Sequence, residues 1–134
     1  MNIFIDCEWN EFGGDLISMA LCSEEGEEFY EVLPCDNPGE WVSENVMPIL
    51  GKEPITIGLF RRRLEVFLAQ FDSVNIIADW PEDISRFCDA LITGPGQRLN
   101  TPPLSMQVVQ ITTYSEKPHN ALYDARGILK AVCG

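Results

Sequence analysis

Residues 3–9 read Ile-Phe-Ile-Asp-Cys-Glu-Trp, and this stretch governs how the rest of the chain can be arranged. Three apolar residues give way to two carboxylates, Asp6 and Glu8, which are two positions apart. Side chains alternate between the two faces of a strand, so both carboxylates would project from one side of a buried strand. Two like charges at that spacing repel each other unless a cation lies between them. A divalent metal ion with oxygen ligands is the simplest such cation.

The alternative for this motif is a surface strand that carries two solvated acids, and composition alone does not exclude it.

The chain has 134 residues, 46% hydrophobic and 22% charged, which predicts a single domain over residues 1–134 with a core of its own. No apolar stretch approaches the roughly 20 residues that a membrane span needs. The N-terminus lacks the basic region and the cleavage site of a signal peptide.

The cysteines and the net charge narrow the class of protein. The five cysteines are odd in number and show no Cys-x-x-Cys spacing, which favours free thiols in a reducing cytoplasm over a zinc site or disulfides. A net charge of −12 argues against a broad basic surface for nucleic acid, but not against an enzyme that engages a few nucleotides through metal ions. The one basic cluster, residues 61–63, is either a solvated flank or a phosphate contact.

The order of apolar patterns and turn residues predicts an antiparallel meander followed by alternating helices and strands. We expect strands at 2–7, 15–22, 28–33, 74–78 and 105–112. We expect a first helix that starts at either 37–38 or 39 and ends at 50, and further helices at 57–71, 79–92 and 120–132. Residues 93–103 are rich in Gly and Pro and are expected to form a loop. This order is typical of an α/β fold with a mixed sheet, in which the meander forms one side and helices flank the sheet.

Three helix starts carry capping residues. Thr56 and Asn120 stand where a side chain can accept backbone N–H groups of the first turn. Asp79 and Glu82 have the spacing of a capping box, and Pro81 suits a first turn.

Helical spacing also predicts which side chains face the core in the first and last helices. In the first helix we expect a buried face of Trp41, Val42, Val46 and Ile49. In the last we expect a buried face of Leu122, Ala125, Leu129 and Val132.

Acidic residues recur where predicted strands end and predicted helices begin. Asp6 and Glu8 end the first strand, an acid follows the strand at 74–78, and His119 and Asp124 open the last helix. Such positions meet at one edge of an open α/β sheet. Three or four carboxylates suit two Mg²⁺ or Mn²⁺ ions about 4 Å apart, which clamp both sides of a phosphodiester. A histidine beside them can deprotonate the attacking water.

The order Asp-x-Glu, Asp and His-x-x-x-x-Asp resembles the DEDD 3′–5′ exonuclease superfamily in its histidine-containing branch, DEDDh, which has an RNase H-like fold. Residues 4–32, FIDCEWNEFGGDLISMALCSEEGEEFYEV, are similar to its first motif and following hairpin. Residues 76–87, IIADWPEDISRF, are similar to the middle motif of small bacterial and phage 3′–5′ exoribonucleases. The resemblance spans residues 2–132.

The resemblance implies a role for each motif residue. It implies that the metal ions are held by Asp6, Glu8, Asp83 and Asp124, with His119 as the general base. The family's middle motif has Asn, three residues and then Asp, which puts Asp79 at the Asn position and Asp83 at the metal position. The predicted capping role of Asp79 also favours Asp83, and Asp79 is the alternative.

Two aromatic residues near the first motif are candidates for substrate binding. Trp9 departs from the small or hydroxyl residue that is common in the family. It is either a platform for a terminal base, worth about 1–3 kcal/mol where such stacking occurs, or a core tryptophan. Phe12 has the same two interpretations.

Together these features predict a metal-dependent 3′–5′ exoribonuclease that releases nucleoside 5′-monophosphates from the 3′ end of single-stranded RNA. A DNA exonuclease is the first alternative, because only contacts to the 2′-OH separate the two. A non-catalytic nucleic-acid-binding module is the second, and the intact set of four acids and a histidine argues against it. A calcium-binding domain is disfavoured, because the chain contains no D-x-D-x-D-G loop. The sequence does not decide between a monomer and a homodimer.

Overall fold

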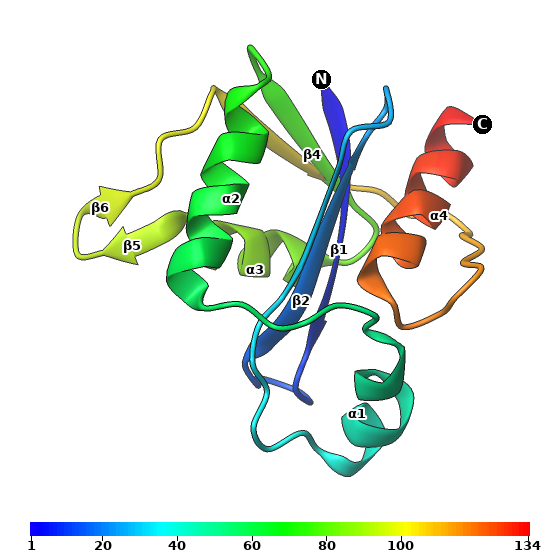
Figure 1. Ribbon diagram of the computed structural model, residues 1–134. Helices are drawn as coiled ribbons and strands as arrows, with labels where there is room; N and C mark the ends of the chain where they lie inside the picture. The colour runs from blue at the N-terminus through cyan, green and yellow to red at the C-terminus, as the bar shows by residue number, and fades with distance from the viewer.

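A computed structural model describes residues 1–134 and contains one five-stranded mixed sheet with helices on both faces (Figure 1). The strands of this sheet are β1 (Asn2–Trp9), β2 (Leu16–Ser23), β3 (Glu28–Val32), β4 (Val74–Ala78) and β7 (Leu104–Val108). Their order is β3-β2-β1-β4-β7, in which β3, β2 and β1 are antiparallel neighbours and β1, β4 and β7 are parallel. The predicted mixed α/β fold, with a meander on one side of the sheet, is confirmed.

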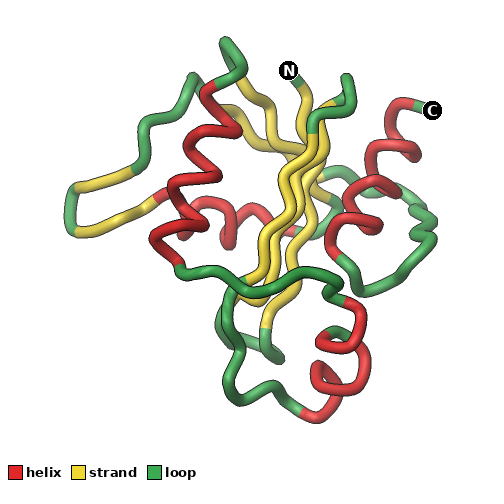
Figure 2. The backbone as a smooth tube through the Cα atoms, viewed as in Figure 1, coloured by secondary structure: helices red, strands yellow, loops and turns green.

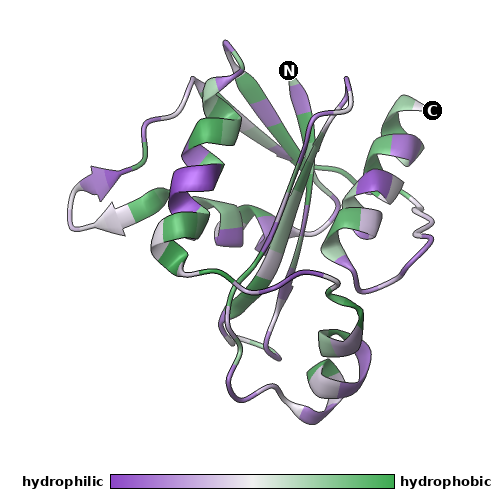
Figure 3. Cartoon of the chain, viewed as in Figure 1, coloured by the Kyte–Doolittle hydropathy of each residue, from purple (hydrophilic) through white to green (hydrophobic).

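The central position of β1 follows from its sequence. Ile3, Phe4 and Ile5 are all fully buried, so the strand is covered on both faces at this point. An apolar run without alternation is typical of such a strand. Figure 3 shows apolar residues concentrated along the central strands.

Helices cover the two faces of the sheet unequally. On one face α2 (Ile57–Ala69) and α3 (Pro81–Leu91) enclose the main core, and on the other lies α4 (Ala121–Cys133) alone. At one end of the sheet the short helix α1 (Glu40–Asn45) continues into the 3-10 helix η1 (Met47–Ile49). No helix has both the length and the apolar character that crossing a lipid bilayer requires.

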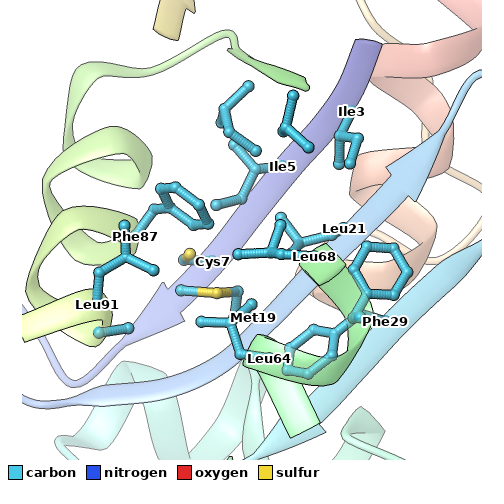
Figure 4. Close-up of a cluster of buried hydrophobic side chains, with 14 of the residues drawn as sticks. Ile3, Ile5, Cys7, Met19, Leu21, Phe29, Leu64, Leu68, Phe87 and Leu91 are labelled. Carbon is cyan, nitrogen blue, oxygen red and sulfur yellow. The ribbon is translucent and has the colours of Figure 1, made fainter. Parts of the chain in front are cut away.

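The side chains of β1 alternate between the two faces of the sheet. Figure 4 shows Ile3, Ile5 and Cys7 on the side of the strand that faces α2 and α3. Phe4 points the other way and packs against Ile77 and Ile128 under α4. The alternation continues along the strand and therefore directs Asp6 and Glu8 toward the α4 face.

Two of the predicted caps are confirmed. The Thr56 hydroxyl accepts the Leu59 N–H at 3.2 Å, and the Asn120 side chain accepts the N–H groups of Leu122 and Tyr123.

The predicted capping box at the start of α3 is wrong. Trp80 occupies the cap position and makes no side-chain cap bond, while Glu82 pairs with Arg86 at 3.1 Å. The reason is tertiary, because the Asp79 carboxylate lies with those of Asp6 and Asp83.

The loop and strand predicted between α3 and α4 also differ from the structure. Residues 93–103 contain most of a small hairpin, formed by β5 (Ile92–Gly94) and β6 (Gln97–Arg98), which projects from the body (Figure 1). The strand predicted at 105–112 ends at Val108, because β4, its only neighbour, ends at Ala78.

The basic cluster and two helix faces need correction as well. Arg61 is not a free solvated flank, since its guanidinium donates to the carbonyl groups of Ala90 and Ile92 at the end of α3, and a phosphate contact of the cluster stays a prediction. In α4 the inward row consists of Ala121, Ala125 and Ile128, and Val132 is exposed. In α1 the expected inward Trp41 is also exposed.

Candidate active site

The first two acids lie where β1 extends beyond its parallel neighbour. Pairing between β1 and β4 stops at Phe4 and Ile77, whereas β1 continues to Trp9 alongside β2. Asp6 and Glu8 therefore lie at an open edge of the sheet, where β4 no longer pairs with β1. They face α4, as the alternation of side chains requires.

Asp83 reaches this edge from the first turn of α3. It is 1% exposed, and its Oδ1 accepts the backbone N–H of Cys7 at 3.1 Å. Its other oxygen, Oδ2, is enclosed and has no hydrogen-bond partner. A buried carboxylate with one unpartnered oxygen is costly, so this atom is the first sign of a ligand site.

The carboxylates form two groups that share one member. One group is Asp6, Glu8 and Asp124, the other is Asp6, Asp79 and Asp83, and within each the nearest oxygens lie within 4.8 Å of one another. The Oδ2 atom of Asp6 is enclosed without a hydrogen-bond partner. The structure thus brings together every acid that the sequence singled out, including both candidates for the middle position.

The electrostatic cost of this arrangement is visible in the pKa of each carboxyl group. Burial, followed by the charge of Asp83, holds the pKa of Asp6 well above its usual range. Burial, with the charges of neighbouring acids, raises the pKa of Glu8 and of Asp83 to about 8. Burial also raises the pKa of Asp124. Without a cation, burial and mutual repulsion therefore favour the protonated forms of these carboxyl groups.

The end of the site opposite β1 is formed by the start of α4 and the loop before it. The backbone N–H of His119 donates to Asp124 Oδ2 at 3.1 Å, so the two residues are fixed relative to each other. His119 has a φ of 71°, in the left-handed region that few residues other than glycine adopt. Its ring meets the indole of Trp41 edge to face, with centroids 4.9 Å apart.

The loop that leads to His119 passes close to α4 because of a glycine. Figure 2 shows this long loop running beside the helix. A Cβ atom at Gly127 would collide with the carbonyl of Tyr114, so only glycine permits the approach. The approach brings Thr113 and Ser115 to the edge of the acidic groups.

A cavity of about 330 Å³ opens onto the acids and the histidine. It is lined by Asp6, Asp79, Thr113, Ser115, Pro118, His119, Asp124 and Ile128. No lysine or arginine is among these residues. Asp79 lines the cavity whereas the buried Asp83 does not, which sequence spacing did not reveal.

The two aromatic candidates for substrate binding stand apart from the cavity lining. Trp9 is half-buried beside the main core, and the Arg86 guanidinium lies 5.3 Å from its ring centroid. Phe12, on the turn after β1, is 97% exposed. Their role in binding stays a prediction.

Sequence reasoning missed several residues at or beside the site, among them Thr113, Ser115 and Trp41. Thr113 and Ser115 lie in a segment without a regular pattern, so no sequence signal marks them. Trp41 carried a signal for burial, and it lies instead against His119.

Comparison of the chain with models of known protein families, and with curated proteins, finds no match.

Proposed function

We propose that this protein is a metal-dependent 3′–5′ exoribonuclease of the DEDDh type, with an RNase H-like arrangement of its mixed sheet. One observation carries the proposal. Two enclosed carboxylate oxygens, Asp6 Oδ2 and Asp83 Oδ2, have no hydrogen-bond partner and lie within acidic groups that contain no basic side chain. A cation is the partner that such oxygens lack.

The donor set suits two Mg²⁺ or Mn²⁺ ions, since all ligands are carboxylate oxygens. Asp6 belongs to both groups, so it would contact both ions. Glu8 and Asp124 would complete one site, and Asp83 the other, with Asp79 as the alternative ligand there. When bound, two such ions stabilise the charge on the phosphoryl oxygens and on the attacking and leaving oxygens.

The protein's own groups divide the remaining work. His119 stands at the rim of the cavity and would accept the proton of the attacking water. Asp124 accepts the His119 N–H and so keeps this loop beside the acids. Attack at the last phosphodiester would break the bond from phosphorus to the 3′-oxygen of the penultimate nucleotide. The products would be a nucleoside 5′-monophosphate and a chain one nucleotide shorter.

The acidic surface agrees with an enzyme that grips only the end of its substrate. With a net charge of −12, binding through many phosphate contacts is unfavourable. All five cysteines are free, which suits a reducing cytoplasm. A DNA exonuclease would use the same acids and histidine, so the nature of the sugar is decided by the test.

The test uses single-stranded RNA and DNA of one sequence, each labelled at the 5′ end, with Mn²⁺ or with EDTA. We expect a ladder that shortens by one nucleotide at a time, on RNA faster than on DNA, only with Mn²⁺. Asp6→Asn is the inactive control, and Asp36→Asn, an exposed acid outside the site, is its matched active control. Undiminished cleavage after thorough chelation would overturn the proposal. Faster cleavage of DNA would change the substrate class.

A further inference from the structure

The segment from α1 to η1 is joined to the site at both of its ends. Before α1, the Asn10 side chain accepts the Gly39 N–H and donates to the Asn37 carbonyl, both at 2.8 Å. After η1, the Asn120 side chain donates to the Ile49 carbonyl at 2.8 Å. Asn10 follows β1 directly, and Asn120, which is 3% exposed, caps α4. The segment therefore bridges the strand that carries two acids and the helix that carries the third.

Trp41 lies in the first turn of α1, between the two ends of this bridge, and is not part of its core. The small core beneath α1 is formed by Val42 and Val46 packing on Ile17, whereas Trp41 is 49% exposed. Its indole instead meets the His119 ring at 4.9 Å with the ring planes 83° apart. Edge-to-face contacts of this kind are attractive beyond the area that they bury. Burial does not explain the position of Trp41, but the contact with His119 does.

The His119 imidazole needs a contact from outside its own loop to stay in one orientation. Its backbone is held in the left-handed region with φ of 71°, and its backbone N–H is fixed on Asp124. These contacts fix the main chain but leave the imidazole free to change rotamer. Trp41 supplies a ring contact to that imidazole and is absent from the lining of the cavity. Its contact is therefore with the histidine rather than with a substrate in the cavity.

We propose that Trp41 is a positioning residue, which holds the His119 imidazole in one orientation at the rim of the cavity. The proposal rests on the proposed function, in which His119 accepts a proton. The α1–η1 bridge makes the support rigid, because both of its ends are hydrogen-bonded to elements of the site. Misplacement of a catalytic group by about 1 Å can cost 10²-fold in rate, so loss of the support reduces turnover.

The first experiment measures the contact itself without any nuclease activity. His119 is the only histidine, so its imidazole C–H signals in a proton NMR spectrum are unambiguous. We expect the indole ring current to displace these signals in the wild type. In Trp41→Leu, which keeps an apolar side chain, they move to the unperturbed position, and in Ser43→Ala, a control on the same helix, they stay. Identical signals in the wild type and in Trp41→Leu would overturn the contact. Should Trp41→Leu fail to fold, Trp41→Phe gives the same comparison through a smaller ring current.

The second experiment separates positioning from substrate binding. We expect Trp41→Leu to lower kcat about tenfold with KM and Mn²⁺ affinity unchanged, and Trp41→Phe to recover most of the loss. In a His119→Asn background, Trp41→Leu should have no further effect, since the two residues act as one unit.

Two results would overturn the positioning role. If Trp41 stacks on RNA instead, KM rises and the effect persists in the His119→Asn background. A wild-type protein without nuclease activity would overturn the proposed function and the catalytic role of Trp41 with it. In that case the NMR signals would still decide whether the contact between the two rings exists.

Discussion

The Asp83 carboxylate accepts the backbone N–H of Cys7 at 3.1 Å, across 76 residues of chain. Cys7 lies between Asp6 and Glu8, at a point where β4 no longer runs beside β1. The bond therefore gives a partner to a buried donor and ties α3 to the strand that bears the first two acids. Asp83 uses one oxygen for this structural bond, and its other oxygen, Oδ2, is enclosed without a hydrogen-bond partner.

The double role of Asp83 predicts different costs for two substitutions. Asp83→Asn and Asp83→Ala both remove the charge, but only asparagine keeps an oxygen that can accept the Cys7 N–H. We expect Asp83→Ala to be less stable than Asp83→Asn by about 1–3 kcal/mol, the cost of an unsatisfied buried group. Urea unfolding of both variants in EDTA measures this difference. Equal stability would mean that the Cys7 bond contributes nothing.

Asp79 is expected to behave in the opposite way. It makes no capping bond at α3, and its charge is among those that raise the pKa of Asp6. Asp79→Asn should therefore leave the metal-free protein equally stable or slightly more stable, while it weakens Mn²⁺ binding. Isothermal titration calorimetry and thermal unfolding measure the two effects, with Asp89→Asn, an acid on α3 outside both groups, as the control. A clear loss of stability in EDTA would restore a structural role for Asp79.

Without metal, the protein should lose stability as the pH rises. The pKa of Glu8 rises from 4.5, and that of Asp83 from 3.8, to about 8 in the folded chain, so at intermediate pH the folded state binds more protons than the unfolded state. Under that condition the free energy of unfolding falls as the pH rises from about 4.5 to about 8. Urea unfolding in EDTA at pH 5.5 and 8 checks the sign. Glu8→Gln, which cannot ionise, should show a shallower dependence, and a wild type that gains stability over this range would contradict the electrostatic account.

Mn²⁺ should raise the melting temperature, because a ligand that binds only the folded state stabilises it by mass action. Asp6 belongs to both groups of acids, so Asp6→Asn should lose most of this shift while it keeps the fold. Differential scanning calorimetry with and without Mn²⁺ measures the shift, and Asp36→Asn should retain it. Equal shifts in Asp6→Asn and the wild type would reject Asp6 as a ligand.

The parts of the fold that the sequence predicted are those set by local patterns. The run of residues 3–5 indicated a buried strand, and Thr56 and Asn120 marked helix starts correctly, because each depends on its immediate neighbours. Asp79 was misassigned for the same reason. Its spacing to Glu82 fits a cap, but the side chain lies with Asp6 in a group formed across the sheet, and local spacing contains no information about that.

The contact between His119 and Trp41 could not be predicted from the sequence, for a different reason. Helical spacing placed Trp41 with Val42 and Val46 on one face, but α1 has only six residues and buries only Val42 of them. Which apolar residue stays outside depends on where the helix is held, and Asn10 and Asn120 set that position from distant parts of the chain.

His119 gives the most direct test of the catalytic proposal, because it is the only histidine. Its backbone φ of 71° strains most residues, but asparagine tolerates this region, so His119→Asn is the variant that isolates the imidazole. The backbone N–H that donates to Asp124 survives in the variant, so metal binding and folding should be unchanged. Loss of the base should lower the rate by roughly 10²–10⁴-fold. Single-turnover cleavage of labelled RNA at saturating Mn²⁺ measures the effect, with the melting temperature as the control for folding. A variant that cleaves at the wild-type rate would leave the carboxylates as the whole catalytic apparatus and would remove this protein from the histidine branch.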